Sequence, residues 1–272
     1  MVAKEHKITL ASGFTFDFTN MFGPERLTAG DIKALHSKIA DAQKKITHLR
    51  KTGEVAGHLS KDGDPEHVYF TRLPYVQKGY PNTGALLKEL TAYGTEVRNT
   101  CDAVIFCGIG GSYLGGKVLY DCFTSELWSR AKKASRLSKV YFSGNSLDVD
   151  EMEASWKDLL AGRKAKGKKL NVALVAISKS GTTLETSTAF LYFFEKLHRA
   201  AAEFNLNVAV VTDKKNTTGP FNILSAEHGW TMFDLVEGIG GRFSVLSTPG
   251  LIVAAVLGMD LKRLLKGARD MD

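Results

Sequence analysis

The stretch with the clearest chemical potential is a turn rich in hydroxyl groups. It consists of Ser178, Lys179, Ser180, Gly181, Thr182 and Thr183. The apolar run before it, 172–177, is typical of a parallel strand buried on both faces, and a helix is predicted directly behind it. The free N–H groups of such a turn and the positive end of the helix dipole point at one place, where four hydroxyls add donors. The pattern predicts a phosphate-binding cradle, with simple N-capping as the alternative, although a cap needs only one hydroxyl.

A glycine turn, Gly108–Ser112, follows another short apolar stretch and holds two residues of chemical interest. Gly111 lets the backbone approach a ligand, and Ser112 offers a hydroxyl group. A dinucleotide-binding fingerprint would need glycine where the chain has Tyr113. A P-loop comes nearer in spacing, but Val118 stands where a Ser or Thr would hold magnesium. We therefore favour a ligand-facing turn over either nucleotide site, with a purely structural turn as the alternative.

A third turn, Gly238–Ser244, places Arg242 just after a predicted strand. A guanidinium flanked by flexible backbone can neutralise a phosphate or an oxyanion. Taken alone this motif is weak, because the same arginine could form an ordinary surface salt bridge. The three turns together carry more weight, since each of them follows a predicted strand.

The composition is that of an ordinary globular protein. Of 272 residues, 44% are hydrophobic and 24% are charged, which excludes a disordered chain. The longest apolar run, 250–259, is too short to span a bilayer, and the charged N-terminus lacks a signal segment. The three cysteines have neither metal-binding spacing nor the even number typical of a disulfide framework, so a reducing cytoplasm is expected.

The net charge of +7 is partly due to a basic run at 163–169. No aromatic residues interleave this run, and it falls between a predicted helix and a predicted strand. We therefore predict a solvated loop rather than a nucleic-acid surface. A mild positive excess also suits an anionic small substrate.

Residues 1–82 are predicted to form an arm, a long helix and an irregular linker. Thr28 is the expected N-cap of the helix, which should end near Gly53. Its apolar residues recur at three- and four-residue steps. A partner helix could bind this stripe, but packing on the protein's own domain is expected. Residues 53–65 are predicted to be a loop, and 67–80 has no assignable pattern.

Residues 83–272 are predicted to form one α/β domain. Short apolar strands alternate with helices, which indicates parallel βαβ units and a three-layer αβα sandwich around a parallel five-stranded sheet. The predicted strands are 103–107, 140–142, 172–177, 208–212 and 231–233. Helices are expected around 86–97, 114–127, 148–160, 183–202 and 221–228. Ligands of such sheets bind beyond the carboxyl ends of the strands, where the glycine and hydroxyl turns are predicted to lie.

The three turns, which read GIGGSYLGG, SKSGTTLET and GGRFSVLS in this order, closely resemble those of the glucose-6-phosphate isomerase family. The resemblance runs from about Thr83 to the C-terminus. It implies a pair of sugar-isomerase (SIS-type) domains of Rossmann-like topology, of which this chain holds the first. It also implies interconversion of glucose 6-phosphate and fructose 6-phosphate through a cis-enediol, without metal or cofactor. The implied enzyme is cytoplasmic and, at full length, a homodimer.

The same resemblance implies a role for each turn. Gly111 and Ser112 should line the sugar-phosphate site. Arg242 should steady the enediolate near the C1–C2 edge of the sugar, where a pre-aimed guanidinium best stabilises the developing charge. The phosphate should be held by Ser178, Lys179, Ser180, Gly181, Thr182 and Thr183. The implied partner is a sugar phosphate, and neither nucleic acid nor a membrane.

Three hypotheses about function remain open. The family's catalytic glutamate and its ring-opening histidine and lysine lie in motifs C-terminal to anything in this sequence, whose final helix is expected to be cut short at Asp272. The leading hypothesis is therefore the phosphate-binding half of an isomerase that lacks the base. A stand-alone sugar-phosphate sensor is the second, and a nucleotide-binding protein that uses the near P-loop is the third.

Overall fold

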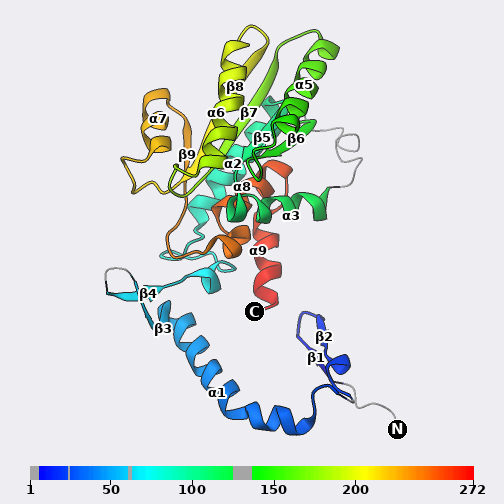
Figure 1. The fold of residues 1–272 in the computed structure, drawn as a ribbon, viewed down its shortest axis with the longest axis vertical. Coiled ribbons are helices and arrows are strands. Elements are labelled where there is room, and N and C mark those ends of the chain that lie inside the picture. Colours follow the sequence, from blue (N-terminus) through cyan, green and yellow to red (C-terminus); the bar gives the residue numbers. More distant parts are fainter. Residues whose placement is uncertain (1–5, 24, 61–62, 125–136) are drawn as a thin grey trace.

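The computed structural model describes residues 6–23, 25–60, 63–124 and 137–272, and a five-stranded parallel sheet lies at its centre (Figure 1). The strand order is β6-β5-β7-β8-β9, and every neighbouring pair is parallel. The strands are β5 (Ala103–Cys107), β6 (Lys139–Ser143), β7 (Leu170–Ile177), β8 (Phe204–Thr212) and β9 (Thr231–Asp234). The predicted α/β fold with a parallel five-stranded sheet is confirmed.

Helices cover both faces of the sheet and make it the middle layer of three (Figure 1). One face carries α2 (Gly84–Thr100), α3 (Leu114–Phe123), α8 (Thr248–Leu257) and α9 (Leu261–Asp270). The other carries α5 (Val149–Lys166), α6 (Leu184–Arg199) and α7 (Pro220–His228). In β5, Val104 and Phe106 belong to the first core, whereas Ile105 belongs to the second. Successive side chains of a strand point to opposite faces, so a strand between two layers is apolar along its whole length.

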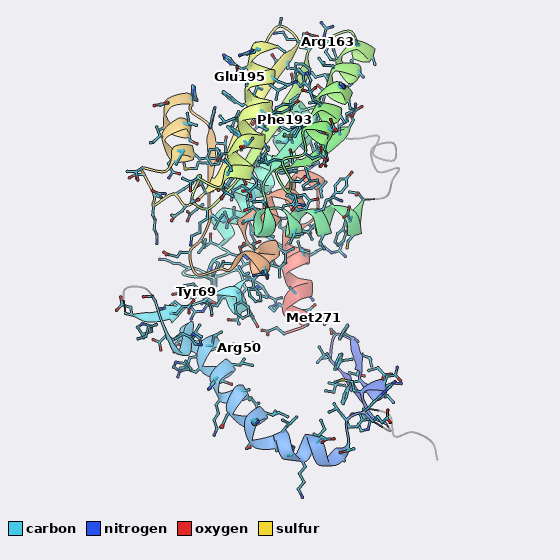
Figure 2. The ribbon with its side chains drawn as sticks, in the orientation of Figure 1. Arg50, Tyr69, Arg163, Phe193, Glu195 and Met271 are labelled. Carbon is cyan, nitrogen blue, oxygen red and sulfur yellow. The ribbon has the colours of Figure 1, made fainter. Side chains whose placement is uncertain are left out.

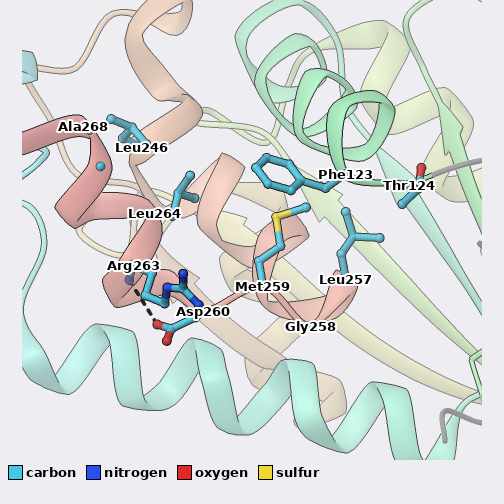
Figure 3. A pocket seen from close by; sticks show the side chains of 11 residues that line it. Phe123, Thr124, Leu246, Leu257, Gly258, Met259, Asp260, Arg263, Leu264 and Ala268 are labelled. Atoms are coloured by element: carbon cyan, nitrogen blue, oxygen red, sulfur yellow. Dashed lines mark hydrogen bonds between the residues drawn. The ribbon is translucent and has the colours of Figure 1, made fainter. Parts of the chain in front are cut away.

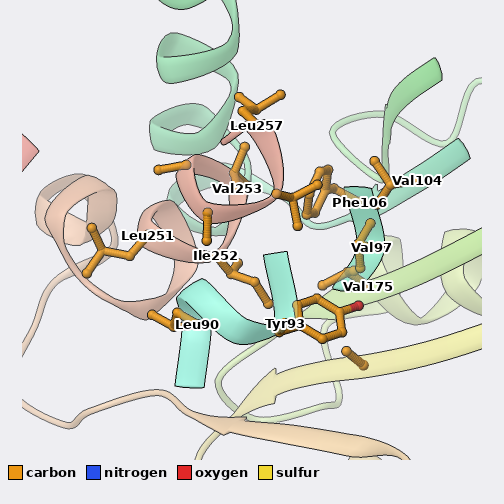
Figure 4. Packing of buried hydrophobic residues seen from close by; sticks show 14 of the residues in the cluster. Leu90, Tyr93, Val97, Val104, Phe106, Val175, Leu251, Ile252, Val253 and Leu257 are labelled. Carbon is orange, nitrogen blue, oxygen red and sulfur yellow. The ribbon is translucent and has the colours of Figure 1, made fainter. Parts of the chain in front are cut away.

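The first core is built around α8, which is buried at every residue from Thr248 to Leu257. A helix that is apolar all round needs neighbours on all sides, and α2, α3 and the sheet supply them (Figure 4). α2 approaches most closely at Gly94, where a Cβ atom would collide with the backbone of Ala255. None of the described helices is both long and apolar enough to cross a membrane.

The predicted elements of this domain are present, with some ends shifted. β5 has the predicted bounds, whereas β7 begins at Leu170 and β8 at Phe204, both earlier than predicted. The added residues at the amino ends of β7 and β8 alternate between polar and apolar side chains. The continuous apolar run therefore gives too short a length for each strand. The predicted continuation of α3 to residue 127 lies outside the described residues.

The basic run at 163–169 is not a loop, which corrects that prediction. Its first four residues form the last turn of α5, and Gly167 ends the helix in the left-handed conformation with φ 63°. Cations are favoured in the last turn of a helix because they face the negative end of its dipole. Lys166 also forms an ion pair with the buried carboxylate of Asp102, with 2.6 Å between Nζ and Oδ1.

The N-terminal residues form an arm that projects from the body (Figure 1). It comprises a hairpin of β1 (Lys7–Thr9) and β2 (Thr15–Asp17), the short helix η1 (Thr19–Met21), and the long helix α1 (Ala29–Thr52). The predicted cap is confirmed: Thr28 Oγ1 accepts from the N–H of Asp31, whose carboxylate accepts from the N–H of Thr28. The predicted helix end is confirmed at Gly53, which has φ 88°.

Residues 53–65 are not a simple loop, which is a second correction. β3 (Glu54–Leu59) pairs with β4 (Pro65–His67) in an antiparallel hairpin, and the single-turn helix η2 (Phe70–Arg72) follows. Both strands are short and mostly exposed, and neither contributes a residue to the two hydrophobic core clusters. Their pairing therefore leaves no hydrophobic alternation from which it could have been predicted.

The apolar stripe of α1 does not pack on the protein's own domain, which is a third correction. No residue of α1 is buried. Leu35, Ile39 and Ile46 keep 39%, 50% and 56% of their surface exposed. The projecting geometry of the arm is the reason, because it holds the helix away from the sheet and its covering helices (Figure 1).

Candidate functional site

The three turns singled out in the sequence lie beyond the carboxyl ends of parallel strands. The turn at 108–112 follows β5, the hydroxyl-rich turn at 178–183 follows β7, and the turn at 238–244 comes after β9. β5 and β7 are neighbours in the sheet, with Cys107 opposite Ala176, so the first two turns leave the sheet side by side. This is the edge at which open parallel sheets bind their ligands.

The first and third turns are in direct contact. The hydroxyl oxygen of Ser244 lies 2.6 Å from the carbonyl oxygen of Gly111 and 2.7 Å from that of Gly241, and its one proton is donated between these two acceptors. A Cβ atom on Gly111 would collide with the backbone of Gly241. Close packing of two backbones thus accounts for the glycine at 111. Sequence reasoning missed Ser244, because a bond between residues so far apart leaves no local signal.

Ser112 ends the short helix η3 (Gly110–Ser112) and is partly exposed. Its backbone N–H donates to the carbonyl of Ile109. Within the described part of the chain its hydroxyl has no hydrogen-bond partner. The predicted role of this hydroxyl at a ligand site stays a prediction.

The hydroxyl-rich turn is held in shape by its own side chains. Ser178 is buried, and its Oγ accepts from the N–H of Gly181 and donates to Oγ1 of Thr183, both at 3.2 Å. Oγ of Ser180 accepts from the N–H of Thr182 at 3.2 Å and from its hydroxyl at 2.9 Å. Gly181 has φ 70°, a conformation that glycine adopts at little cost. All four hydroxyls of the turn therefore take part in its internal hydrogen bonds, and those of Ser178 and Ser180 also accept from backbone N–H groups.

The capping alternative does not describe this turn. Thr183 occupies the N-cap position of α6, but its side chain accepts no capping hydrogen bond. Among the described residues, no side chain accepts from the N–H groups in the first turn of α6, which lie at the positive end of a sixteen-residue helix. An anion placed there would accept from backbone N–H groups and offset the helix dipole.

Lys179 lies in the same turn. Its side chain is exposed. Its carbonyl oxygen accepts from the hydroxyl of Thr212, the last residue of β8, and from the N–H of Asp213, which follows it. The backbone of Lys179 is thus anchored to the sheet, while its ammonium group remains available to a ligand.

Arg242 lies in the first turn of η4 (Gly241–Leu246) and is exposed. No ion pair or hydrogen bond involves its guanidinium within the described part of the chain, so the surface salt bridge considered as an alternative is not formed there. The ring of Phe243 stacks on that of Phe70, with 4.3 Å between centroids, and this contact holds the turn against η2. The guanidinium is therefore held on a fixed turn, without a counter-ion among the residues that the structure describes.

The linker before residue 83 covers the third turn. Tyr69 lies where the arm joins the body (Figure 2). Its ring lies between two glycines, because a Cβ atom on Gly53 or on Gly238 would lie 2.6 Å from the ring. The side-chain amide of Asn82, which is fully buried, donates to the carbonyls of Leu73 and Leu246. These contacts cross the predicted boundary between residues 82 and 83, which stays a prediction.

A polar cavity of about 580 Å³ lies beside the hydroxyl-rich turn. Lys179 lines it, together with Asp213 and Asp234 at the ends of β8 and β9. Glu66 and His67 of β4 close it from the arm side. Gly111, Ser112 and Arg242 do not line this cavity, so the predicted site residues fall into two groups: the hydroxyl-rich turn beside the cavity, and the joined first and third turns. No hydrogen bond connects the two groups in the described part of the chain.

Sequence reasoning missed the acidic residues of this cavity. A signal existed for Asp213 and Asp234, because each directly follows a predicted strand. No local signal existed for Glu66 and His67, because only the pairing of β3 with β4 and the packing of Tyr69 bring them over the sheet edge.

A second cavity, of about 760 Å³, is largely apolar (Figure 3). Phe123 from α3 and Leu257, Met259 and Leu264 from the α8–α9 region line it. Asp260 at its edge accepts from backbone N–H groups and caps α9. Its one acidic side chain is thus already used in capping, and none of the residues of the three turns lines this cavity.

Comparison with known proteins relates this geometry to one family. The chain is 29% identical over 241 residues to a glucose-6-phosphate isomerase of Streptococcus thermophilus, which covers 87% of the chain and 51% of that protein. It is 32% identical over 182 residues to the glucose-6-phosphate isomerase of Acetivibrio thermocellus, covering 66% of the chain and 39% of that protein. The chain thus spans about half the length of the curated relatives it matches, or less.

Solved structures share the fold. A glucose-6-phosphate isomerase of Chlamydia trachomatis superposes with a TM-score of 0.64 at 20% identity, over 96% of this chain and 49% of that one. A hypothetical protein of Thermus thermophilus superposes with a TM-score of 0.61 at 24% identity, over 88% of this chain and 48% of that one. The family model described as phosphoglucose isomerase matches residues 88–272, which is most of the chain. The chain therefore belongs to the phosphoglucose isomerase family.

Proposed function

We propose that this chain binds a hexose phosphate and supplies the phosphate-binding half of an enzyme that interconverts glucose 6-phosphate and fructose 6-phosphate. The observation that carries the proposal is the start of α6. Its first-turn N–H groups have no side-chain cap, and they follow a central strand and a turn with four hydroxyls. A phosphate group fits these donors, since it accepts several hydrogen bonds and carries the charge that the helix dipole favours.

Within this proposal each part of the turn has a role. The hydroxyls of Thr182 and Thr183 and the exposed ammonium group of Lys179 reach the phosphate directly. Ser178 and Ser180 hold the turn in shape through the bonds described above and offer their remaining hydrogen-bonding capacity to the ligand. Gly181 allows the sharp reversal that brings these donors together.

The second group of residues would act on the sugar. The hydroxyl of Ser112 and the backbone at Gly111 are proposed to line the sugar site. The guanidinium of Arg242 is proposed to stabilise the enediolate, whose negative charge is greatest in the transition state. No general base is assigned to the residues of this chain. Turnover is therefore proposed to need the rest of the family's fold, in a cytoplasmic enzyme that is a homodimer at full length.

Calorimetric titration of the 272-residue chain with fructose 6-phosphate, and with fructose as the control, tests the binding. Saturable binding of the phosphorylated sugar alone is expected. Lys179→Ala should weaken it roughly ten- to a hundred-fold, because a hydrogen bond to a charged group contributes about 1.5–3 kcal/mol. Lys214→Ala is the matched control, since Lys214 is exposed and lies outside the polar cavity. Failure to bind either sugar would overturn the proposal.

Isomerase activity separates the catalytic proposal from the sensor alternative. The chain, prepared from a host without its own isomerase, is expected to bind fructose 6-phosphate without converting it. Adding the C-terminal half of a family member should then restore turnover, and Arg242→Ala should abolish that turnover. Binding without turnover, both by the chain alone and after the C-terminal half is added, would favour a sensor. Turnover by the chain alone would show that it contains its own base.

A further inference from the structure

The turn that carries Arg242 is anchored unevenly. Its carboxyl end is held by the hydrophobic core, because Val245 and Leu246 of η4 pack against the first core cluster. Its amino end holds Arg242 and Phe243, and neither belongs to a core cluster of the described residues. On the inner side, the turn meets the first turn through the glycine contact and the Ser244 hydroxyl described above. The position of the Arg242 end therefore depends on a few specific contacts.

The contact on the outer side comes from η2. The ring of Phe70 stacks on that of Phe243, with 4.3 Å between the ring centroids and 18° between the ring planes. Phe243 keeps half of its surface exposed, and neither ring belongs to a core cluster. Stacked aromatic rings have a preferred separation and tilt, so this contact restricts the orientation of the turn as well as its distance from η2. The stack thus joins two surface segments and fills no core.

The segment that presents Phe70 is itself fixed at two points. The backbone N–H of Tyr69 donates to the carbonyl oxygen of Gly238, in the third turn, at 2.8 Å. The tyrosine ring fills the space beside Gly238 and Gly53, where a Cβ atom would collide with it. Arg72 places its guanidinium 5.0 Å from the centre of that ring and donates to a carbonyl oxygen in the last turn of α1 at 3.1 Å. Phe70 therefore approaches the third turn from a segment bound both to that turn and to the end of α1.

The direction of the Arg242 side chain depends on the backbone beneath it. Its guanidinium is exposed and makes no ion pair or hydrogen bond with the described residues, so no partner of its own aims it. Phe243 is the next residue, and the stack with Phe70 therefore acts on the backbone directly beside Arg242. Because the guanidinium ends a long side chain, a small rotation of the backbone displaces it further. A misplacement of about 1 Å at a reacting centre can lower a rate about a hundred-fold.

We propose that Phe70 is a positioning residue for Arg242. By stacking on Phe243, it holds the third turn so that the guanidinium lies where negative charge develops on the enediolate. The role assigned to Phe70 rests on the proposed function, in which Arg242 stabilises that charge. Phe70 lies before residues 88–272, which the family model matches. The proposed site therefore takes a positioning group from the linker, outside the part of the chain that carries the three turns.

Calorimetric titration of the 272-residue chain with two sugar phosphates tests this role. Fructose 6-phosphate is uncharged at C1 and C2, whereas 5-phosphoarabinonate carries a planar carboxylate that imitates the charge of the enediolate. Arg242→Ala should weaken binding of 5-phosphoarabinonate roughly ten- to a hundred-fold, because it removes a hydrogen bond to a charged group. Phe70→Ala should weaken it roughly three- to ten-fold, the loss expected for one aromatic pair. Neither substitution should change the affinity for fructose 6-phosphate.

The double variant separates positioning from direct contact with the ligand. If Phe70 acts through Arg242, Phe70→Ala should have no further effect on binding of 5-phosphoarabinonate once Arg242 is replaced by alanine. Phe70→Tyr keeps the stacking ring and should restore the affinity lost in Phe70→Ala. An effect of Phe70→Ala that persists in the Arg242→Ala background would mean that Phe70 contacts the ligand or supports the whole site, and the positioning role would be wrong.

Phe16 provides the matched control. Its exposed ring stacks on that of Phe18 in the N-terminal hairpin, with 5.6 Å between centroids, and lies outside both core clusters. Phe16→Ala also removes one stacked surface ring, and it should leave the affinity for both ligands unchanged. Thermal melting should show that every variant is folded at the temperature of the titration. The ratio of the two affinities then reports positioning, because partial unfolding would lower both alike.

The outcomes distinguish the positioning role from the proposed function. A parent chain that binds neither ligand would overturn the proposed function and the role of Phe70 with it. Unchanged binding of 5-phosphoarabinonate by Arg242→Ala would overturn the assignment of Arg242, on which the role of Phe70 depends. If the parent chain binds both ligands and Arg242→Ala weakens only 5-phosphoarabinonate, unchanged binding by Phe70→Ala would overturn the positioning role alone.

Discussion

At the scale of single residues, the candidate site depends on where the backbones of its turns meet. Gly111 packs against Gly241, and the hydroxyl of Ser244 bridges the two turns. Ser112 and Arg242 are carried by these turns, one on each. The relative position of a hydroxyl and a guanidinium is therefore controlled by a contact between glycines that themselves have no functional group.

Gly111→Ala should separate the two turns. The new methyl group would meet the backbone of Gly241, which cannot rotate away as a side chain could, so unfolding free energy should fall by about 1–3 kcal/mol. Gly240→Ala is the control, because its Cβ atom would make ordinary contacts with the ring of Phe243, and its φ of −65° suits alanine. Urea unfolding of both variants checks this. Equal stability of the two variants would contradict the close packing.

The buried hydroxyl of Ser178 makes a second prediction at this scale. Ser178→Ala would leave the N–H of the buried Gly181 without its acceptor, at a cost of about 1–3 kcal/mol. Ser180→Ala removes an exposed hydroxyl that only other exposed groups contact, and a change within about 0.5 kcal/mol is expected. Thermal melting of the two variants distinguishes them. A larger loss for Ser180→Ala would show that the turn is held together differently.

At the scale of elements, close helix packing and local capping stabilise different parts of the molecule. α8 is buried at every residue and can be surrounded only if α2 comes very near, which Gly94 permits. α1 has no buried residue and depends on its caps and its own hydrogen bonds. Substitutions where α8 packs against α2 should therefore lower the stability of the whole fold. Substitutions in α1 should affect that helix alone.

Gly94→Ala should destabilise the whole domain. The methyl group would press on the backbone of Ala255, so a loss of about 1–3 kcal/mol or more is expected from overpacking. Gly84→Ala, at the start of the same helix, meets no atom within 4 Å, so it should be neutral or slightly stabilising. Denaturant unfolding of the two variants checks the difference. A neutral Gly94→Ala would mean that α2 and α8 can move apart at little cost.

The start of α1 should respond to acid. Hydrogen bonds from the hydroxyl and the N–H of Thr28 lower the pKa of Asp31 below its ordinary value of 3.8. A carboxyl group with a lowered pKa stabilises the fold at higher pH, and its contribution is lost as the pH falls through that pKa. NMR shifts of the first helical turn should therefore move toward coil values below about pH 3.8. Asp31→Asn should shift them at neutral pH. Unchanged shifts in acid would contradict the capping box.

At the scale of the whole molecule, the chain exposes more surface than a compact monomer. Its accessible area is 16076 Å², whereas a compact protein of 29.7 kDa exposes about 11,600 Å². The projecting hairpin and α1 are consistent with this excess (Figure 1). Both hydrophobic core clusters draw only on residues from Leu87 onward.

Removal of residues 1–52 should leave the body folded. The deletion removes peripheral contacts, such as the pair between Arg50 and Asp272, but no core residue. The melting temperature should fall by no more than about 2–4 °C, which corresponds to about 1 kcal/mol in a domain of this size. Calorimetry of the shortened chain measures this. A much larger fall would show that the arm contributes to the cooperative core.

Local chemistry determined much of the fold from the sequence alone. The bounds of β5 and the caps of α1 at Thr28 and Gly53 are predictable because apolar runs, hydroxyl caps and C-terminal glycines act within a few residues of each other. The three turns could be placed beyond strand ends for the same reason. Their assignment to a sugar-phosphate site stays a prediction until binding is measured.

Only the tertiary structure decided which distant groups meet. The bond from Ser244 to Gly111, and the approach of Glu66 and His67 to the ends of β8 and β9, join residues far apart in sequence. The stripe of α1 shows the same limit, because its spacing predicts an apolar contact but not what supplies it. The spacing of apolar residues along a helix predicts which face is hydrophobic. The arrangement of the whole chain decides whether its own core or another molecule covers that face.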